Sequence, residues 1–130
     1  MKVLVPVDGL EASLRAVDYA IKMADSSLVL LNVQDLGVAN EFVDCKEIAE
    51  QAAAKALKDA TDKAEAAGAD FKSVARTGPV AERIAQVARD EDVQHIVMGT
   101  RGLGSIQGLL MGSVAMKVIH LAEVPITLIK

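Results

Sequence analysis

Short, almost continuous apolar runs alternate along this chain with segments whose apolar residues recur every three or four positions. Ser27–Val33 is a run of the first kind, and the segment Leu10–Ile21 is of the second kind. The first pattern is typical of a strand buried on both faces, and the second is typical of a helix with one face against a core. The predicted strands are Lys2–Val7, Ser27–Val33, Phe71–Ala75, Val93–Met98 and Val124–Ile129, and the predicted helices lie over Leu10–Ile21, Lys46–Ala67, Val80–Val87 and Val114–Leu121.

This alternation of strand and helix restricts the fold class. Strands joined through helices pair in parallel with right-handed crossovers, which predicts an α/β fold with one doubly wound, five-stranded parallel sheet and helices on both faces. The alternating pattern of Phe71–Ala75 and the position of Pro125 indicate that the third and last strands are sheet edges. The chain has 130 residues, the length of one domain, residues 1–130. Ligands of such sheets bind where the winding reverses, between the first strand and either the third or the fourth.

Glycines cluster after the fourth predicted strand. Gly99-Thr100-Arg101-Gly102 follows that strand, and nine residues later Gly112-Ser113-Val114 opens the last predicted helix. The free N–H groups and positive dipole of a helix start favour an anion, while glycines permit close approach of a phosphate and can adopt positive φ. Arg101 is the only cation in the loop, and Lys117 lies one turn into the helix. Without a Walker lysine the loop favours holding a phosphate over cleaving it, and a plain connector is the structural alternative.

Charge and composition argue against several function classes. The chain has a net charge of −4, a pI near 5.1, and only one tyrosine and two phenylalanines as aromatic residues, so it has no basic or stacking surface for nucleic acid. Its apolar runs are shorter than the roughly 18 to 20 residues of a membrane helix, and the first one is too short for a secretory signal. The single Cys45 fits a reducing compartment. We therefore expect a cytoplasmic protein without nucleic-acid or membrane partners.

Few other residues suggest chemistry. His95 and His120 lack the spacing to cysteines or paired carboxylates that a metal site or catalytic dyad requires. Ser13 is typical of the first turn of a helix. Asp8 has two interpretations, a cap for the first helix and a ligand for a molecule bound at the winding reversal. If the first and fourth strands are neighbours, Asp8 and Gly99 face one crevice.

The spaced motif Gly99-x2-Gly102-x9-Gly112-Ser113 resembles the ATP-binding branch of the universal stress protein family. Pro6-Val7-Asp8-Gly9 at the end of the first strand and Val124-Pro125 at the start of the last extend the resemblance to the whole chain. The resemblance implies a Rossmann-like, adenine nucleotide alpha hydrolase-like fold with strand order 3-2-1-4-5. It also implies a homodimer formed through the last strand and the binding of ATP, with Mg²⁺, with weak or no turnover.

The resemblance also implies which residues contact the nucleotide. The loop and the start of the last helix would hold the phosphates and ribose, Asp8 and the backbone of Val33 would line the adenine and ribose side, and Val7 and Met98 would form apolar walls. The complete implied set is Pro6, Val7, Asp8, Val33, Met98, Gly99, Arg101, Gly102, Gly112, Ser113 and Val114.

Two features depart from the family pattern. The segment Asp35–Cys45 is short for the family, which implies a reduced cover over the nucleotide. Ala115 stands where many members have a second hydroxyl residue, which implies one polar contact fewer.

The predicted function is that of an ATP-binding stress-response protein in which the nucleotide is a regulatory ligand, with at most very slow hydrolysis. One alternative is a slow ATP hydrolase or nucleotidyl-transfer enzyme on a related fold. Asp8 is the only acidic candidate for its base at the expected crevice, and an isolated carboxylate is weak support. A second alternative is a dimeric interaction module with an empty cleft, against which the intact glycine spacing argues.

Overall fold

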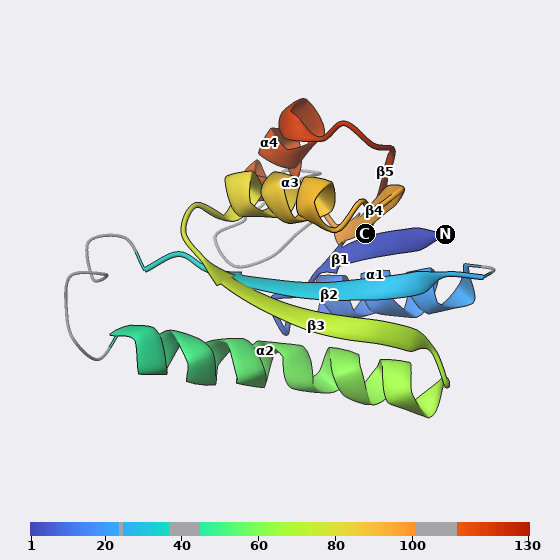
Figure 1. The fold of residues 1–130 in the computed structure, drawn as a ribbon, viewed down its shortest axis with the longest axis horizontal. Coiled ribbons are helices and arrows are strands. Elements are labelled where there is room, and N and C mark those ends of the chain that lie inside the picture. Colours follow the sequence, from blue (N-terminus) through green and yellow to red (C-terminus); the bar gives the residue numbers. More distant parts are fainter. Residues whose placement is uncertain (24, 37–44, 101–111) are drawn as a thin grey trace.

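The computed structural model describes residues 1–23, 25–36, 45–100 and 112–130. Within them, five strands form one parallel sheet of order β3-β2-β1-β4-β5 (Figure 1). The order and the parallel pairing confirm the predicted doubly wound fold. The strands are β1 (Lys2–Pro6), β2 (Ser27–Gln34), β3 (Asp70–Thr77), β4 (His95–Gly99) and β5 (Ile126–Ile129), and the helices are α1 (Glu11–Lys22), α2 (Cys45–Ala66), α3 (Val80–Asp90) and α4 (Ser113–Leu121).

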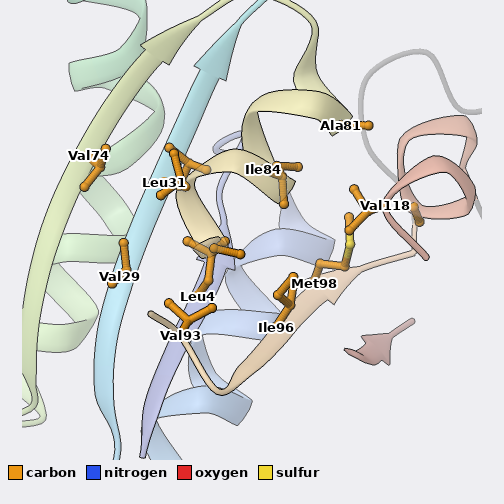
Figure 2. Close-up of a cluster of buried hydrophobic side chains, with 13 residues drawn as sticks. Leu4, Val29, Leu31, Val74, Ala81, Ile84, Val93, Ile96, Met98 and Val118 are labelled. Carbon is orange, nitrogen blue, oxygen red and sulfur yellow. The ribbon is translucent and has the colours of Figure 1, made fainter. Parts of the chain in front are cut away.

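Helices cover both faces of the sheet, with α1 and α2 on one side and α3 and α4 on the other (Figure 1). Side chains alternate along β1, so that Leu4 joins the cluster beneath α3 and α4 while Val3 and Val5 join the cluster beneath α1 and α2. Figure 2 shows the first cluster, to which α3 contributes Ile84 and α4 contributes Val118. Because the central strands are buried on both faces, their sequences are almost continuous apolar runs.

The winding of the sheet reverses at β1. On one side β1 pairs along its length with β2, and on the other it pairs with β4 through Val3↔His95 and Leu4↔Ile96. The carboxyl ends of β1 and β4 are therefore neighbours. Of the two ligand locations left open by the sequence pattern, this topology selects the one between the first and fourth strands.

All strand ends agree with the predictions within two residues, and the deviations have local causes. The last strand begins at Ile126 and not at Val124, because Pro125 has no N–H to donate to a neighbouring strand. The first helix begins after Leu10, which is its N-cap and is 41% exposed, so the prediction that Leu10 lies on the core-facing side of this helix is wrong. Leu121 ends α4 and is exposed as well.

The two edges of the sheet are β3 and β5, as predicted. β3 pairs only with β2, and of its eight residues only Val74 is buried. This exposure accounts for the mostly polar sequence of β3, in which Phe71 and Val74 pack on opposite faces of the sheet. Among the described helices, none combines the length and the apolar character needed to cross a bilayer.

Candidate functional site

A cavity of about 360 Å³ lies at the carboxyl ends of β1, β2 and β4, beside the start of α4. Its volume falls within the range of small-molecule sites, roughly 300 to 1,000 Å³. Nine of the residues implied by the family resemblance line it, namely Pro6, Val7, Asp8, Val33, Met98, Gly99, Gly112, Ser113 and Val114. The other two, Arg101 and Gly102, lie outside the described residues. The topology thus brings the ends of three strands and the start of α4 to one cavity.

Asp8 connects the end of β1 with the start of α1. Its Oδ1 accepts hydrogen bonds from Leu10 N and from Ser13 Oγ, both at 2.8 Å. Leu10 is the N-cap residue, and no side chain accepts from the first-turn N–H groups of α1, so Asp8 forms a turn that precedes the helix. The interpretation of Asp8 as a cap for the first helix is therefore wrong, because its carboxylate accepts from the N-cap residue and from Ser13 Oγ and from no first-turn N–H group. Its role toward a ligand stays a prediction.

Gly99 ends β4 against α1. A Cβ at this position would lie 2.9 Å from the backbone carbonyl carbon of Ala12 and 3.0 Å from its Cβ, closer than side chains pack. Gly99 does not have a positive φ, and Gly112 has a φ of −74°. The predicted left-handed conformation is therefore wrong for Gly99, where space and not backbone geometry requires a glycine. Gly102, Gly104 and Gly108 lie outside the described residues.

The start of α4 faces the cavity without a side-chain cap. Its N-cap residue Gly112 is buried and donates its N–H to the carbonyl of Thr100. The N–H groups of the first turn, together with the helix dipole, favour an anion at this point. Lys117, one turn further, forms an ion pair with Glu82 of α3 and thereby holds the pKa of Glu82 below its ordinary value. No lysine or arginine is found among the described residues that line the cavity.

Several polar residues of the lining were not predicted. Asn32 is 3% exposed; its Nδ2 donates to the carbonyl of Val7 at 2.7 Å and its Oδ1 accepts from Gln34 Nε2 at 2.8 Å. Asn32 therefore ties the end of β2 to the residue that follows β1. The position of Asn32, a polar residue inside the apolar run of the second predicted strand, could have identified it from the sequence. Asp35 also lines the cavity, so the expectation of Asp8 as its only carboxylate is wrong.

One of the two departures from the family pattern lies within the described residues. Ala115, in place of a hydroxyl residue, lines the cavity and is 2% exposed, and it packs into the core cluster beneath α3 and α4. The expected reduced cover from Asp35–Cys45 falls mostly on residues 37–44, outside the described residues. Thr100, within the glycine motif, also lines the cavity.

The histidines take ordinary polar positions, as predicted. His95 Nε2 lies 2.7 Å from Thr127 Oγ1 and joins β4 to β5 by a hydrogen bond, and His120 is exposed on α4. Within the ranges that the structure describes, no three His, Cys, Asp or Glu residues are placed to hold a metal ion.

Comparison with known proteins identifies the family to which this fold and cavity belong. The family model described as the universal stress protein family matches residues 1–130. The chain belongs to the universal stress protein family. A universal stress protein of Methanocaldococcus jannaschii is 30% identical over 138 residues, an alignment that spans 99% of this chain and 81% of that relative.

Solved structures confirm the Rossmann-like fold of this universal stress protein. The hypothetical protein MJ0577, solved as a test case of structural genomics, superposes with a TM-score of 0.87 at 26% identity, covering 99% of this chain and 94% of that one. A universal stress protein crystallised in complex with cAMP superposes with a TM-score of 0.77 at 26% identity, covering 100% and 97% of the two chains.

Proposed function

We propose that this universal stress protein binds ATP in the cavity between β1 and β4, and that the nucleotide acts as a regulatory ligand in a stress response. The observation that carries the proposal is the convergence of three strand ends and the uncapped start of α4 on one cavity. Val33, Met98 and Val114 provide apolar walls suited to a base and ribose. The start of α4 suits a phosphate.

The family comparison supports an adenine nucleotide as the ligand. The relative solved with cAMP is 26% identical to this chain, and cAMP shares adenine, ribose and a phosphate with ATP. We choose ATP because the glycine spacing over residues 99–113 resembles that of the ATP-binding branch. The eleven residues implied by that resemblance form the proposed site.

The chemistry around the cavity favours binding over turnover. The described lining offers no lysine or arginine to neutralise a departing phosphate. The Oδ1 atom of Asp8 already accepts two hydrogen bonds within the protein, so an attacking water could be held only by Oδ2. Mg²⁺ would accompany ATP, coordinated mainly by the phosphate oxygens. We therefore expect at most very slow hydrolysis.

We also propose that the protein is a cytoplasmic homodimer that pairs through β5. β5 is an edge strand of apolar sequence, Ile126–Ile129, and pairing with its own copy about a two-fold axis would satisfy both edges. The single Cys45 supports a reducing compartment.

ATP binding is tested by thermal unfolding of protein that has been stripped of small molecules. At free ATP of about 100 times the dissociation constant, binding adds about 2.7 kcal/mol of stability, which raises the Tm of a domain of this size by on the order of 10 °C. Gly112→Val serves as the matched variant, because its side chain would block the approach of a phosphate to the start of α4. Its folding is checked by circular dichroism. No Tm shift of the wild-type protein with millimolar Mg-ATP would contradict the proposal.

A further inference from the structure

The last hydrogen bond between β1 and β2 comes from a side chain. The backbone pairing of the two strands ends at Pro6↔Leu31, and Val7 N then donates to the carbonyl of Leu31 at 2.7 Å. If the parallel ladder continued, the carbonyl of Val7 would accept from the N–H of Val33. It accepts from Asn32 Nδ2 at 2.7 Å, and no backbone hydrogen bond joins Val33 to Val7 in the described part of the chain.

The side-chain amide of Asn32 is held in one orientation. Asn32 is 3% exposed, and its Oδ1 accepts from Gln34 Nε2 at 2.8 Å. The carbonyl of Val7 can only accept a hydrogen bond, so it requires the N–H side of the amide. Asn32 thus donates to the carbonyl that the N–H of Val33 would otherwise reach.

Val33 consequently keeps its backbone groups outside the ladder. Because backbone groups alternate in direction along a strand, those of Val33 point to the same side of β2 as the carbonyl of Leu31, which is the side of β1. The carbonyl of Gln34 points to the other side and accepts from Gly78 N, just after β3. β1 has already ended at this level, and Val33 lines the cavity together with Val7. The N–H and the carbonyl of Val33 are therefore a donor and an acceptor side by side at the cavity.

This order of donor and acceptor distinguishes between purine bases. On the Watson–Crick edge of adenine, N1 accepts a hydrogen bond and the neighbouring amino group donates one, so the edge complements an N–H beside a carbonyl. Hypoxanthine has the reverse order, with a hydrogen on N1 and a carbonyl oxygen beside it. A base of the second kind would leave the two backbone groups unpaired.

We propose that Asn32 is a positioning residue for recognition of the base: by donating to the carbonyl of Val7, it keeps the N–H of Val33 available to the ligand. Without the amide of Asn32, the N–H of Val33 is the backbone donor next in register for that carbonyl, and the ladder would gain one more hydrogen bond. The inference rests on the proposed function, because it requires that the cavity holds an adenine nucleotide.

The test compares the binding of ATP and ITP by calorimetry in wild-type protein and in Asn32→Leu, which is similar in volume and lacks the amide. ITP has hypoxanthine in place of adenine and is otherwise the same nucleotide. We expect the wild type to prefer ATP by about 10- to 100-fold. Asn32→Leu should lose at least about tenfold of this preference, through weaker binding of ATP.

Thr127→Val is the matched control. Thr127 Oγ1 shares a hydrogen bond with His95 and does not line the cavity, so this variant should lower the Tm and leave the preference for ATP unchanged. Amide hydrogen exchange of nucleotide-free protein, followed by NMR, tests the backbone directly. In the wild type, the N–H of Val33 should be less protected than that of Leu31, which lies within the β1–β2 pairing. In Asn32→Leu, the N–H of Val33 should become protected.

Four results would refute the positioning role. They are a wild type without preference for ATP over ITP, an unchanged preference in Asn32→Leu, an equal loss of ATP and ITP affinity in that variant, and wild-type protection of Val33 equal to that of Leu31. If wild-type protein binds neither nucleotide, the proposed function fails and the inference fails with it.

Discussion

At the scale of single residues, Asp8 performs a structural task at the position proposed for ligand contact. Its Oδ1 accepts from both Leu10 N and Ser13 Oγ. Ser13 Oγ also lies 3.0 Å from the carbonyl of Leu10, so the three residues form one local network. Any effect of an Asp8 variant on nucleotide affinity must therefore be separated from its effect on the start of α1.

Two variants separate these effects. Asp8→Asn retains the Oδ1 acceptor, whereas Asp8→Ala removes it and should cost about 1 kcal/mol of unfolding free energy, as loss of a hydrogen-bond acceptor does. Urea denaturation of nucleotide-free protein measures both. We expect Asp8→Asn to stay within about 0.5 kcal/mol of the wild type. Equal destabilisation by the two variants would show that the charge of Asp8, and not its acceptor, holds the helix start.

Predictions for single residues agreed with the structure where they depended on the position of a residue in its own strand or loop. They failed where a residue contacts a distant part of the chain. Asp8 was placed at the crevice because it follows the first strand at the expected reversal of the winding, and it does line the cavity. Asn32 was missed because its role depends on the carbonyl of Val7, which β1–β2 pairing brings within reach. The need for glycine at position 99 was predicted, but its cause was wrong, because the limiting contact is with Ala12 of α1, a residue far away in sequence.

At the scale of elements, Glu91 joins the strands at the end of the molecule opposite the cavity. Its carboxylate pairs with Lys72 of β3 at 2.8 Å and with Lys2 of β1 at 3.2 Å. Hydrogen bonds from Lys72 and then from Lys2 hold the pKa of Glu91 below its ordinary value of 4.5. Glu91 follows α3 directly, so one side chain links that helix end to β1 and β3.

This arrangement predicts a pH dependence of stability. Because the pKa of Glu91 is lower in the folded than in the unfolded state, its contribution is fully present above the unfolded pKa and is lost as pH falls through the folded pKa. Between about pH 6 and pH 3 the wild type should therefore lose more stability than Glu91→Gln does. Asp62→Asn, which breaks the exposed ion pair with Lys58, is the control and should change the pH profile little. Parallel profiles for the wild type and Glu91→Gln would contradict the prediction.

The sequence predicts the elements themselves better than their ends. The apolar runs of β1, β2 and β4 are continuous because helices cover both faces, and that burial is visible in the sequence. The start of α1 was misplaced because Leu10 continues the helical spacing of Leu14 and Val17 although it precedes the helix and is exposed. Periodicity does not distinguish the last residue of a turn from the first residue of a helix.

At the scale of the whole molecule, the two sheet edges differ in character. The edge strand β3 exposes the charged residues Asp70, Lys72 and Arg76, which discourage pairing with another sheet. The edge strand β5 has the sequence Ile126-Thr127-Leu128-Ile129, without a charge. The homodimer is therefore proposed at β5 and not at β3.

The hydrogen bonds to β4 show which backbone groups of β5 remain available. Ile96 N donates to the carbonyl of Pro125 at 2.9 Å, and Thr100 N donates to the carbonyl of Ile129 at 2.8 Å. Because backbone groups alternate in direction along a strand, Thr127 also points its N–H and carbonyl toward β4. The N–H of Leu128 then points away from the sheet, toward the position of a partner strand.

Removal of that N–H should dissociate the dimer. Leu128→Pro lacks the outward donor and places a ring at the seam between the two copies, so we expect a monomer at micromolar concentration in sedimentation velocity. The side chain of Leu128 also packs against the core cluster beneath α3 and α4. Leu128→Ala loses the same packing but keeps the N–H, and it should remain a dimer. A wild-type monomer would refute the dimer, and a dimeric Leu128→Pro would place its interface elsewhere. Because the cavity lies at the strand ends and is not lined by Leu128, the monomeric variant should still show the thermal shift with Mg-ATP.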